Sequence, residues 1–132
     1  AGIYGPGRSV ADQIKAGTAM RISKAGQVFS RIHVEDIATV LAASIANPQP
    51  GGIYNVCDDE PAPSSEVTSY VCGLMNIAPP PLIPFEKAAL SPISKSFWED
   101  NRRVRNDKIK AELGVKLAFP DYKTGMRAVL GN

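Results

Sequence analysis

The sequence has few of the residues that mark disulfide-bonded, metal-binding or membrane-spanning proteins. Its 132 residues include two cysteines, one histidine and one tryptophan. Cys57 and Cys72 lie far apart, so neither a disulfide framework nor a thiolate metal site is indicated, and a reducing, cytoplasmic setting is expected. No apolar run approaches the roughly 20 residues that a transmembrane helix requires. No membrane partner is therefore expected.

The chain also lacks an excess of charge of one sign. Its 15 Lys and Arg residues and 13 Asp and Glu residues give a net charge of +2. The most basic stretch is interleaved with acidic residues and has few aromatics nearby, which favours a solvated helix face. Its basic members are Arg102, Arg103, Arg105, Lys108 and Lys110. We expect no nucleic-acid partner, because the field of such a chain is weak.

Size and hydrophobic content are those of a folded domain. A chain of 132 residues with 44% hydrophobic content can bury roughly two thirds of the surface that it exposes when unfolded. Helix and strand signals alternate along it, which predicts one domain of mixed α/β class.

Local signals in the first half predict two helices and three extended segments. The turn at Gly5-Pro6-Gly7 follows a short apolar segment, and Ser9 with Asp12 can cap a helix. Glu35 and Asp36 give a second helix an acidic first turn, as the helix dipole favours. The expected elements are a strand ending at 4, a helix over 9–16, an extended segment over 27–33, a helix from about 35 and a strand over 53–57.

Local signals in the second half predict four helices and two strands. The clearest amphipathic helix begins near Ser64, where apolar residues recur at helical spacing up to Met75. Prolines before Leu82 indicate a strand at a sheet edge. The other expected elements are a helix capped by Ser91 with Pro92 after it, a helix over 106–113 ended by Gly114, a strand over 116–119 and a helix capped by Asp121.

Four short motifs, taken in order, resemble the extended short-chain dehydrogenases/reductases, also called the NAD-dependent epimerase/dehydratase family. They are Tyr4-Gly5-Pro6-Gly7, Ile32-His33-Val34-Glu35-Asp36, Gly52 through Val56, and Lys108 through Gly114. The resemblance implies that residues 1–132 form the C-terminal substrate-binding portion of a Rossmann-type NAD(P)-binding fold, with the N-terminal dinucleotide-binding half missing. It also implies that 1–8 and 52–58 are strands of the incomplete Rossmann sheet.

The catalytic motifs of that family have no counterpart in this chain. The family holds its dinucleotide on a Gly-x-x-Gly-x-x-Gly turn and uses a Tyr-x-x-x-Lys pair. Here Tyr4 is followed four residues later by Arg8, and Tyr122 by Met126. We therefore assign no catalytic residue and expect the chain alone to be inactive. NAD or NADP is expected as the cofactor of the complete protein, without tight binding to this chain alone.

The resemblance places the Tyr4 turn where the nicotinamide end of the cofactor meets the substrate cleft. The expected cofactor contacts are Ile3 and Tyr4, and the expected substrate contacts are Arg8, Ser9, Arg31, His33, Phe97 and Trp98. For Phe97 and Trp98 the alternative is core packing, since pocket walls and cores are both apolar. No metal site is expected at Asp58-Asp59-Glu60, because neighbouring residues of an extended segment point to opposite faces.

Two of these residues allow a second interpretation. His33 could titrate in a reaction, or it could be buried and join a strand end to a helix start. Arg31 could hold a phosphate or carboxylate, or it could pair with Glu35 or Asp36. Sugar-nucleotide enzymes of the family commonly carry an arginine where this chain has Phe29, a departure that argues against a sugar-nucleotide substrate.

Two functions follow from the sequence. One is the substrate-binding portion of an NAD(P)-dependent epimerase/dehydratase-like oxidoreductase, acting on a small-molecule substrate. The alternative is a stand-alone, non-catalytic module with a small-molecule-binding or regulatory role. A third and weaker possibility is a structural partner that completes another subunit's sheet. Strands without neighbours leave open edges that pair with other chains, so self-association is expected.

Overall fold

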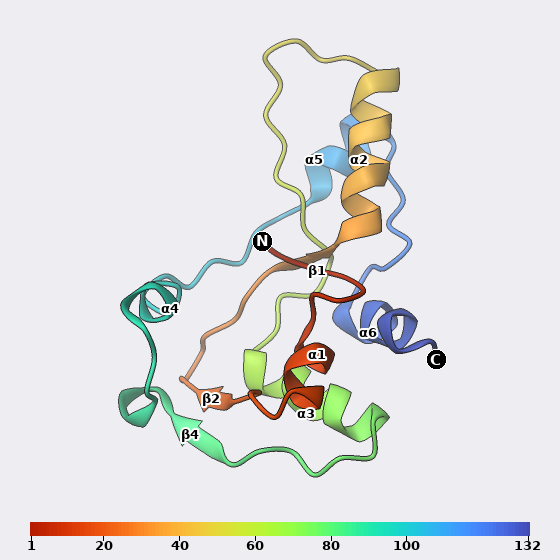
Figure 1. Cartoon of the computed structure of the whole chain (residues 1–132). Helices are drawn as coiled ribbons and strands as arrows, with labels where there is room; N and C mark the ends of the chain where they lie inside the picture. Colours follow the sequence, from red (N-terminus) through yellow and green to blue (C-terminus); the bar gives the residue numbers. More distant parts are fainter.

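Short helices and strands alternate in the computed structural model, which describes residues 1–132 (Figure 1). The strands are β1 (Gly2–Tyr4), β2 (Arg21–Ser23), β3 (Arg31–His33) and β4 (Leu82–Pro84). The helices are α1 (Val10–Lys15), α2 (Val34–Ala46), α3 (Ser64–Leu74), the 3-10 helix η1 (Phe85–Lys87), α4 (Pro92–Ser96), α5 (Asp107–Leu113) and α6 (Tyr122–Leu130). The expected mixed α/β class is confirmed. No helix has the length and apolar character needed to cross a membrane.

The strands form two separate parallel pairs. Ile3 of β1 lies opposite Ile32 of β3, and Ile22 of β2 lies opposite Ile83 of β4. Parallel neighbours need a crossover connection, and the chain between β1 and β3 supplies α1 and β2. Each sheet has only two strands, so both depend on side-chain packing for their stability.

The first hydrophobic core lies where β1 meets α1, α3 and α6. Its buried residues are Tyr4, Ala11, Ala62, Val67, Val71, Tyr122 and Met126. Helix α6 approaches β1 so closely that a Cβ added to Gly125 would lie 1.8 Å from Oη of Tyr4. Only glycine fits at that point, and this approach sets the position of α6.

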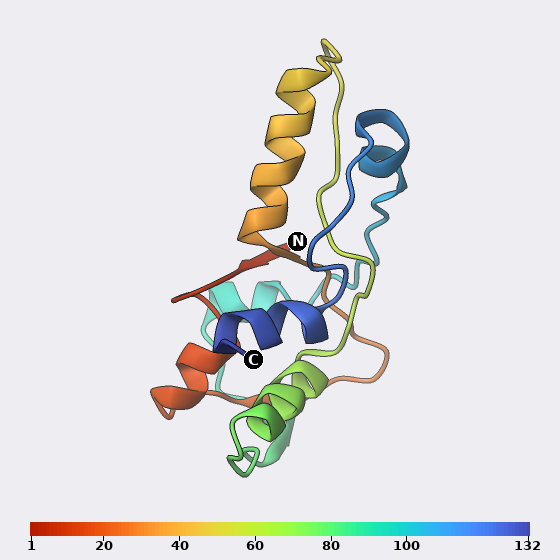
Figure 2. The same cartoon turned by 90° about the vertical axis from the view of Figure 1, so that its right-hand side faces the viewer.

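A second core joins β3 and α2 to α5 and the segment that follows it. Its buried residues are Ile32, Val40, Ile109, Leu113, Val115 and Leu117. Figures 1 and 2 show α2 and α5 together at one end of the molecule and α1 and α3 at the other, with β1 between them. The pair β1–β3 therefore joins two small cores, and neither core is large.

The strand predicted over 116–119 is not formed, because a side chain takes the role of a neighbouring strand. The fully buried carboxylate of Asp36 accepts the N–H groups of Ala118 (2.8 Å) and Phe119 (2.9 Å). At the same turn, Nδ1 of His33 accepts the N–H of Glu35 (3.1 Å) and caps α2. The Ile-His-Val-Glu-Asp segment thus has a structural role.

The strand predicted over 52–58 is also absent, and the strand within 1–8 is limited to Gly2–Tyr4. The later segment makes a single backbone hydrogen bond to β3, from the N–H of Asp58 to the carbonyl of Arg31 (2.7 Å). Tyr54 and Val56 pack against the second core with their side chains. The apolar run therefore reflects side-chain packing without a strand ladder.

One face of the molecule leaves apolar side chains uncovered. Helix α2 carries no charged residue after Asp36, and its outer side exposes Val34, Leu41 (58%) and Ile45 (78%). Strand β1 pairs only with β3, so its other edge is free. An uncharged helix face beside an open strand edge is typical of a surface that contacts another part of a protein.

The close approach of α6 to β1 predicts opposite effects of one substitution at two glycines. Gly125→Ala should lower the free energy of unfolding by about 1–3 kcal/mol, since the new methyl group overlaps the Tyr4 phenol. The control Gly73→Ala in α3 meets open space and should raise the free energy of unfolding by about 0.5–1 kcal/mol through its helix propensity. Denaturant unfolding measures both, and equal effects would contradict the packing described.

Candidate functional site

A cavity of about 560 Å3 opens between β1, α1, β2 and the first turns of α3. We call it the larger cavity. Five residues expected at the site line it together: Ile3, Tyr4, Arg8, Ser9 and Arg31. They come from β1, the turn that follows it, and the start of β3. The parallel pairing of β1 with β3 brings them together, since Tyr4 and Arg31 lie in adjacent strands.

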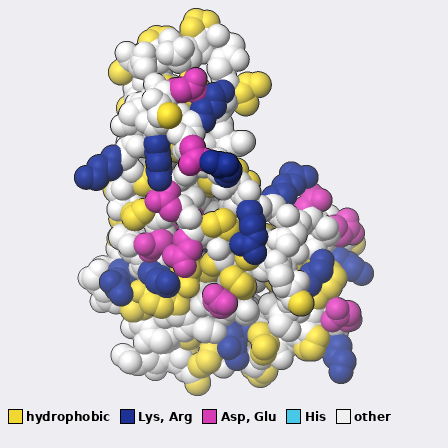
Figure 3. All heavy atoms as spheres, turned by 180° about the vertical axis from the view of Figure 1, so that it is seen from behind, with side chains coloured by type: hydrophobic (Ala, Val, Ile, Leu, Met, Phe, Trp, Pro, Cys, Tyr) yellow, Lys and Arg dark blue, Asp and Glu magenta, His cyan; other side chains and the backbone are white.

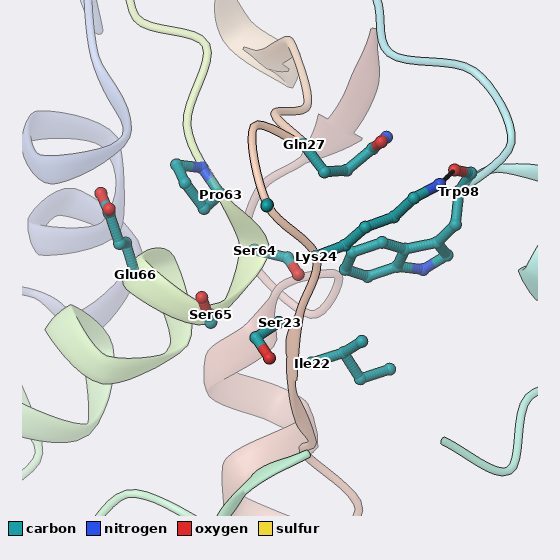
Figure 4. A pocket seen from close by; sticks show the side chains of 10 residues that line it. Ile22, Ser23, Lys24, Gln27, Pro63, Ser64, Ser65, Glu66 and Trp98 are labelled. Atoms are coloured by element: carbon teal, nitrogen blue, oxygen red, sulfur yellow. Dashed lines mark hydrogen bonds between the residues drawn. The ribbon is translucent and has the colours of Figure 1, made fainter. Parts of the chain in front are cut away.

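A second cavity, of about 410 Å3, is lined by β2 and the residues after it, by the start of α3 and by Trp98 (Figure 4). We call it the smaller cavity. The indole of Trp98 forms one wall, and the ammonium group of Lys24 donates a hydrogen bond to the carbonyl of Trp98. The hydroxyls of Ser23 and Ser64 lie nearby in the close view. Ile22 and Ser64 line both cavities, so the two spaces are neighbours.

Tyr4 is buried, and its hydroxyl has no hydrogen-bond partner. Its ring packs edge-on against His33, with 5.2 Å between ring centroids. Burial raises the pKa of Tyr4, and the nearby carboxylates of Asp58 and Asp36 raise it further. A catalytic phenol needs the opposite shift to act as a base near neutral pH. Tyr4 is therefore a neutral wall of the cavity.

Arg31 donates from Nη1 to the carbonyls of Phe29 (2.9 Å) and Ala62 (3.0 Å). The expected alternative, an ion pair with Glu35 or Asp36, is wrong, since Asp36 instead binds the backbone of residues 118 and 119. Burial lowers the pKa of Arg31, while the charge of Asp58 opposes that effect. Arginine keeps its charge under such conditions, so a half-buried cation borders the larger cavity.

Asp58 is a buried acid beside this arginine, with 2% of its surface exposed. Its Oδ1 accepts the N–H of Glu60 (3.1 Å), and its Oδ2 has no partner. Burial raises the pKa of Asp58 to about 7, against the opposing effects of the Glu60 hydrogen bond and the charge of Arg31. Asp58 is therefore partly protonated near neutral pH.

The neighbouring acid Asp59 has different partners. Its Oδ1 accepts hydrogen bonds from Asn106 Nδ2 (2.6 Å) and Lys110 Nζ (2.6 Å). No group of three or more His, Cys, Asp or Glu side chains is arranged to hold a metal ion.

Four of the expected contacts lie elsewhere or have additional roles. His33 is buried and caps α2, as its structural interpretation predicts. Phe97 is 66% exposed and lines neither of these two cavities. Trp98 lines the smaller cavity and also packs against Phe29 and Phe85, so both interpretations of it apply. The Ser9 hydroxyl donates to Asp12 (2.8 Å), which ties it to the start of α1.

The residues of β2 and α3 that line the two cavities were not predicted from the sequence. Ile22 of β2, Ser64 and Thr68 of α3, and Met20 just before β2 line the larger cavity, and none of them was expected at the site. The only signal for β2 is the polar-apolar alternation of Arg21, Ile22 and Ser23, and three residues are too few to establish a period of two.

The comparisons with known proteins agree with this architecture. No family model matches the chain. A Streptomyces protein named 3-diazoavenalumate denitrifying reductase is 29% identical over 138 residues, covering 94% of this chain and 43% of that protein. A conserved protein of unknown function from Silicibacter pomeroyi is 55% identical, with a TM-score of 0.95 over 99% of this chain and 46% of that one. The chain thus spans less than half the length of these relatives.

The fold is also that of a human epimerase family protein solved with NADPH. The TM-score is 0.79 at 17% identity, over 98% of this chain and 46% of the human one. In fold, the chain corresponds to part of a Rossmann-type short-chain dehydrogenase/reductase of the epimerase/dehydratase kind. The predicted resemblance is confirmed at this level.

The shifted pKa of Asp58 predicts a pH-dependent stability. The pKa of this acid rises from 3.8 to about 7 on folding, so its protonated form is favoured in the folded state. Stability should therefore fall as the pH rises from about 4 to above 7, by up to about 4 kcal/mol. Asp58→Asn should remove most of this loss in denaturant unfolding at about pH 5 and pH 8.

The matched control is Asp100→Asn, which changes an exposed acid and should keep the pH dependence of the unchanged chain. A loss of stability at the higher pH that persists in Asp58→Asn would show that another group causes it.

Proposed function

We propose that the chain is the substrate-binding portion of an NAD(P)-dependent epimerase/dehydratase-like oxidoreductase. The observation that supports this most directly is the larger cavity, in which five residues expected from the family resemblance lie together. The Streptomyces relative is named a reductase, and structural neighbours were solved with NADPH or NAD. The substrate is a small molecule, because a cavity of about 560 Å3 lies in the usual range for such ligands.

In this proposal the chain binds and orients the substrate, and the remainder of the complete protein supplies the chemistry. The nicotinamide cofactor supplies or accepts a hydride when bound. Ile3 is 43% exposed on the free edge of β1, where an apolar side chain suits contact with a nicotinamide ring. Tyr4 holds the wall behind it, with its hydroxyl buried against Gly125 of α6.

The setting that we propose is the cytoplasm, with neither nucleic acid nor a membrane as partner. Cys57 and Cys72 are both free and buried, as suits a reducing compartment. Figure 3 shows basic and acidic side chains interspersed over one face of the molecule, a pattern that gives no strong field of either sign.

The alternative function is a non-catalytic module that binds a small molecule or regulates. Two observations favour it: the pKa of the Tyr4 phenol, which borders the cavity, is raised, and no lysine lies four residues after Tyr4. The cavity could therefore bind a ligand without any reaction.

Cofactor binding by the complete gene product separates the two functions. We expect the complete product to bind NADH or NADPH with a Kd in the micromolar range. Residues 1–132 alone should bind at least about 100-fold more weakly. Both affinities can be measured from the quenching of protein fluorescence and from the fluorescence of the nicotinamide ring. Absence of cofactor binding by the complete product would leave the binding module as the function.

We also propose that the isolated chain self-associates through the free edge of β1 and the outer face of α2. Ile45→Lys should shift the chain toward monomers in sedimentation velocity, because it places a charge on the uncovered apolar face. Thr39→Lys is the matched control, since Thr39 is exposed on the same helix but off the apolar face. A monomeric unchanged chain with a high melting temperature would contradict the proposal.

A further inference from the structure

The larger cavity is lined by positive charge alone. Its two charged lining residues are Arg8 and Arg31, and no Asp, Glu or Lys is among the residues of its wall. The remaining lining residues are apolar or carry neutral hydroxyl and amide groups. A molecule with only two more basic than acidic residues overall thus has a strictly basic cavity.

The charge of Arg31 is not balanced by an ion pair. No carboxylate lies within 4.0 Å of its guanidinium nitrogens. Its Nη1 is used by two carbonyls, while Nε and Nη2 have no partner in the chain. Desolvating a cation without a counter-ion is unfavourable, so the pocket gains stability when an anion supplies the missing charge.

The acids around the cavity do not fill this role. Asp12, at the start of α1, accepts the N–H and the hydroxyl of Ser9, both at 2.8 Å. Asp58 is partly protonated near neutral pH because its pKa is raised to about 7 by burial. The positive charge of Arg31 is therefore only partly offset by the protein itself.

Arg8 adds a second, movable cation at the same cavity. The turn that carries it is held by two backbone hydrogen bonds between Gly5 and Arg8, each of 3.0 Å. Its side chain is exposed and makes no hydrogen bond or ion pair in the chain. An arginine of this kind can turn toward a ligand without losing any existing contact.

We propose that the larger cavity binds an organic carboxylate with an apolar body. Arg31 holds the carboxylate through its free Nε and Nη2 donors, whose fork geometry matches two carboxylate oxygens. Met20, Ile22, Val67 and Met126 surround the apolar body. A phosphate dianion fits less well, because solvent screens the exposed charge of Arg8 and the half-buried guanidinium of Arg31 alone balances a single negative charge. This inference rests on the proposed substrate-binding role and names the class of substrate.

The test compares three small probes on residues 1–132: cinnamate, the neutral cinnamamide, and phenyl phosphate. Calorimetry should show cinnamate binding at least about tenfold more tightly than cinnamamide. Arg31→Gln should abolish this preference, and Arg8→Gln should reduce it a few-fold. Arg103→Gln, an exposed arginine away from the cavity, should leave it unchanged.

Several outcomes would overturn the proposal. They are equal affinity for acid and amide, no binding of either up to millimolar concentrations, stronger binding of phenyl phosphate, and a preference that survives in Arg31→Gln. If Arg31→Gln fails to fold by circular dichroism, an unchanged preference in Arg8→Gln overturns it. Cofactor binding by the complete protein is measured separately, so reductase function can stand when carboxylate binding fails, and the reverse.

Discussion

The buried carboxylate of Asp36 is the contact on which the rest of this structure depends. It lies in the first turn of α2 and binds two backbone N–H groups more than eighty residues later in the chain. That contact fixes the start of the final segment, and α6 follows directly, capped by Asp121. Helix α6 then packs on Tyr4 through Gly125 and contributes Met126 to the larger cavity. One buried acid thus determines where a cavity wall stands.

Helices were predictable from the sequence because their signals are local. Gly114 ends α5 in the left-handed conformation, with φ of 64°, and the Asp121 side chain accepts the N–H of Thr124 (2.7 Å). Such caps depend on residues three or four positions apart. The helical spacing of apolar residues from Ser64 onward likewise predicted α3, because this spacing is also a local signal.

Strands were predictable only in part, since pairing joins residues distant in sequence. The apolar runs at 52–58 and 116–119 correctly indicate contact with the core, yet side chains of Asp36 and Asn106 satisfy part of their backbone. The candidate site was likewise predictable only where a local sequence signal exists. The turn after β1 was found from its motif, whereas the wall formed by β2 has no signal of sufficient length. Phe97 lines neither of the two cavities, because adjacent aromatic residues need not face the same way.

The border between the two cavities has a consequence for ligand size. Ile22 belongs to both walls and stands on a three-residue strand paired only with β4. A smaller side chain at this one position would merge the spaces into a channel running from the arginine toward the indole of Trp98. A longer molecule in that channel would meet Lys24 and Glu66 of the smaller cavity in addition to the arginines of the larger one.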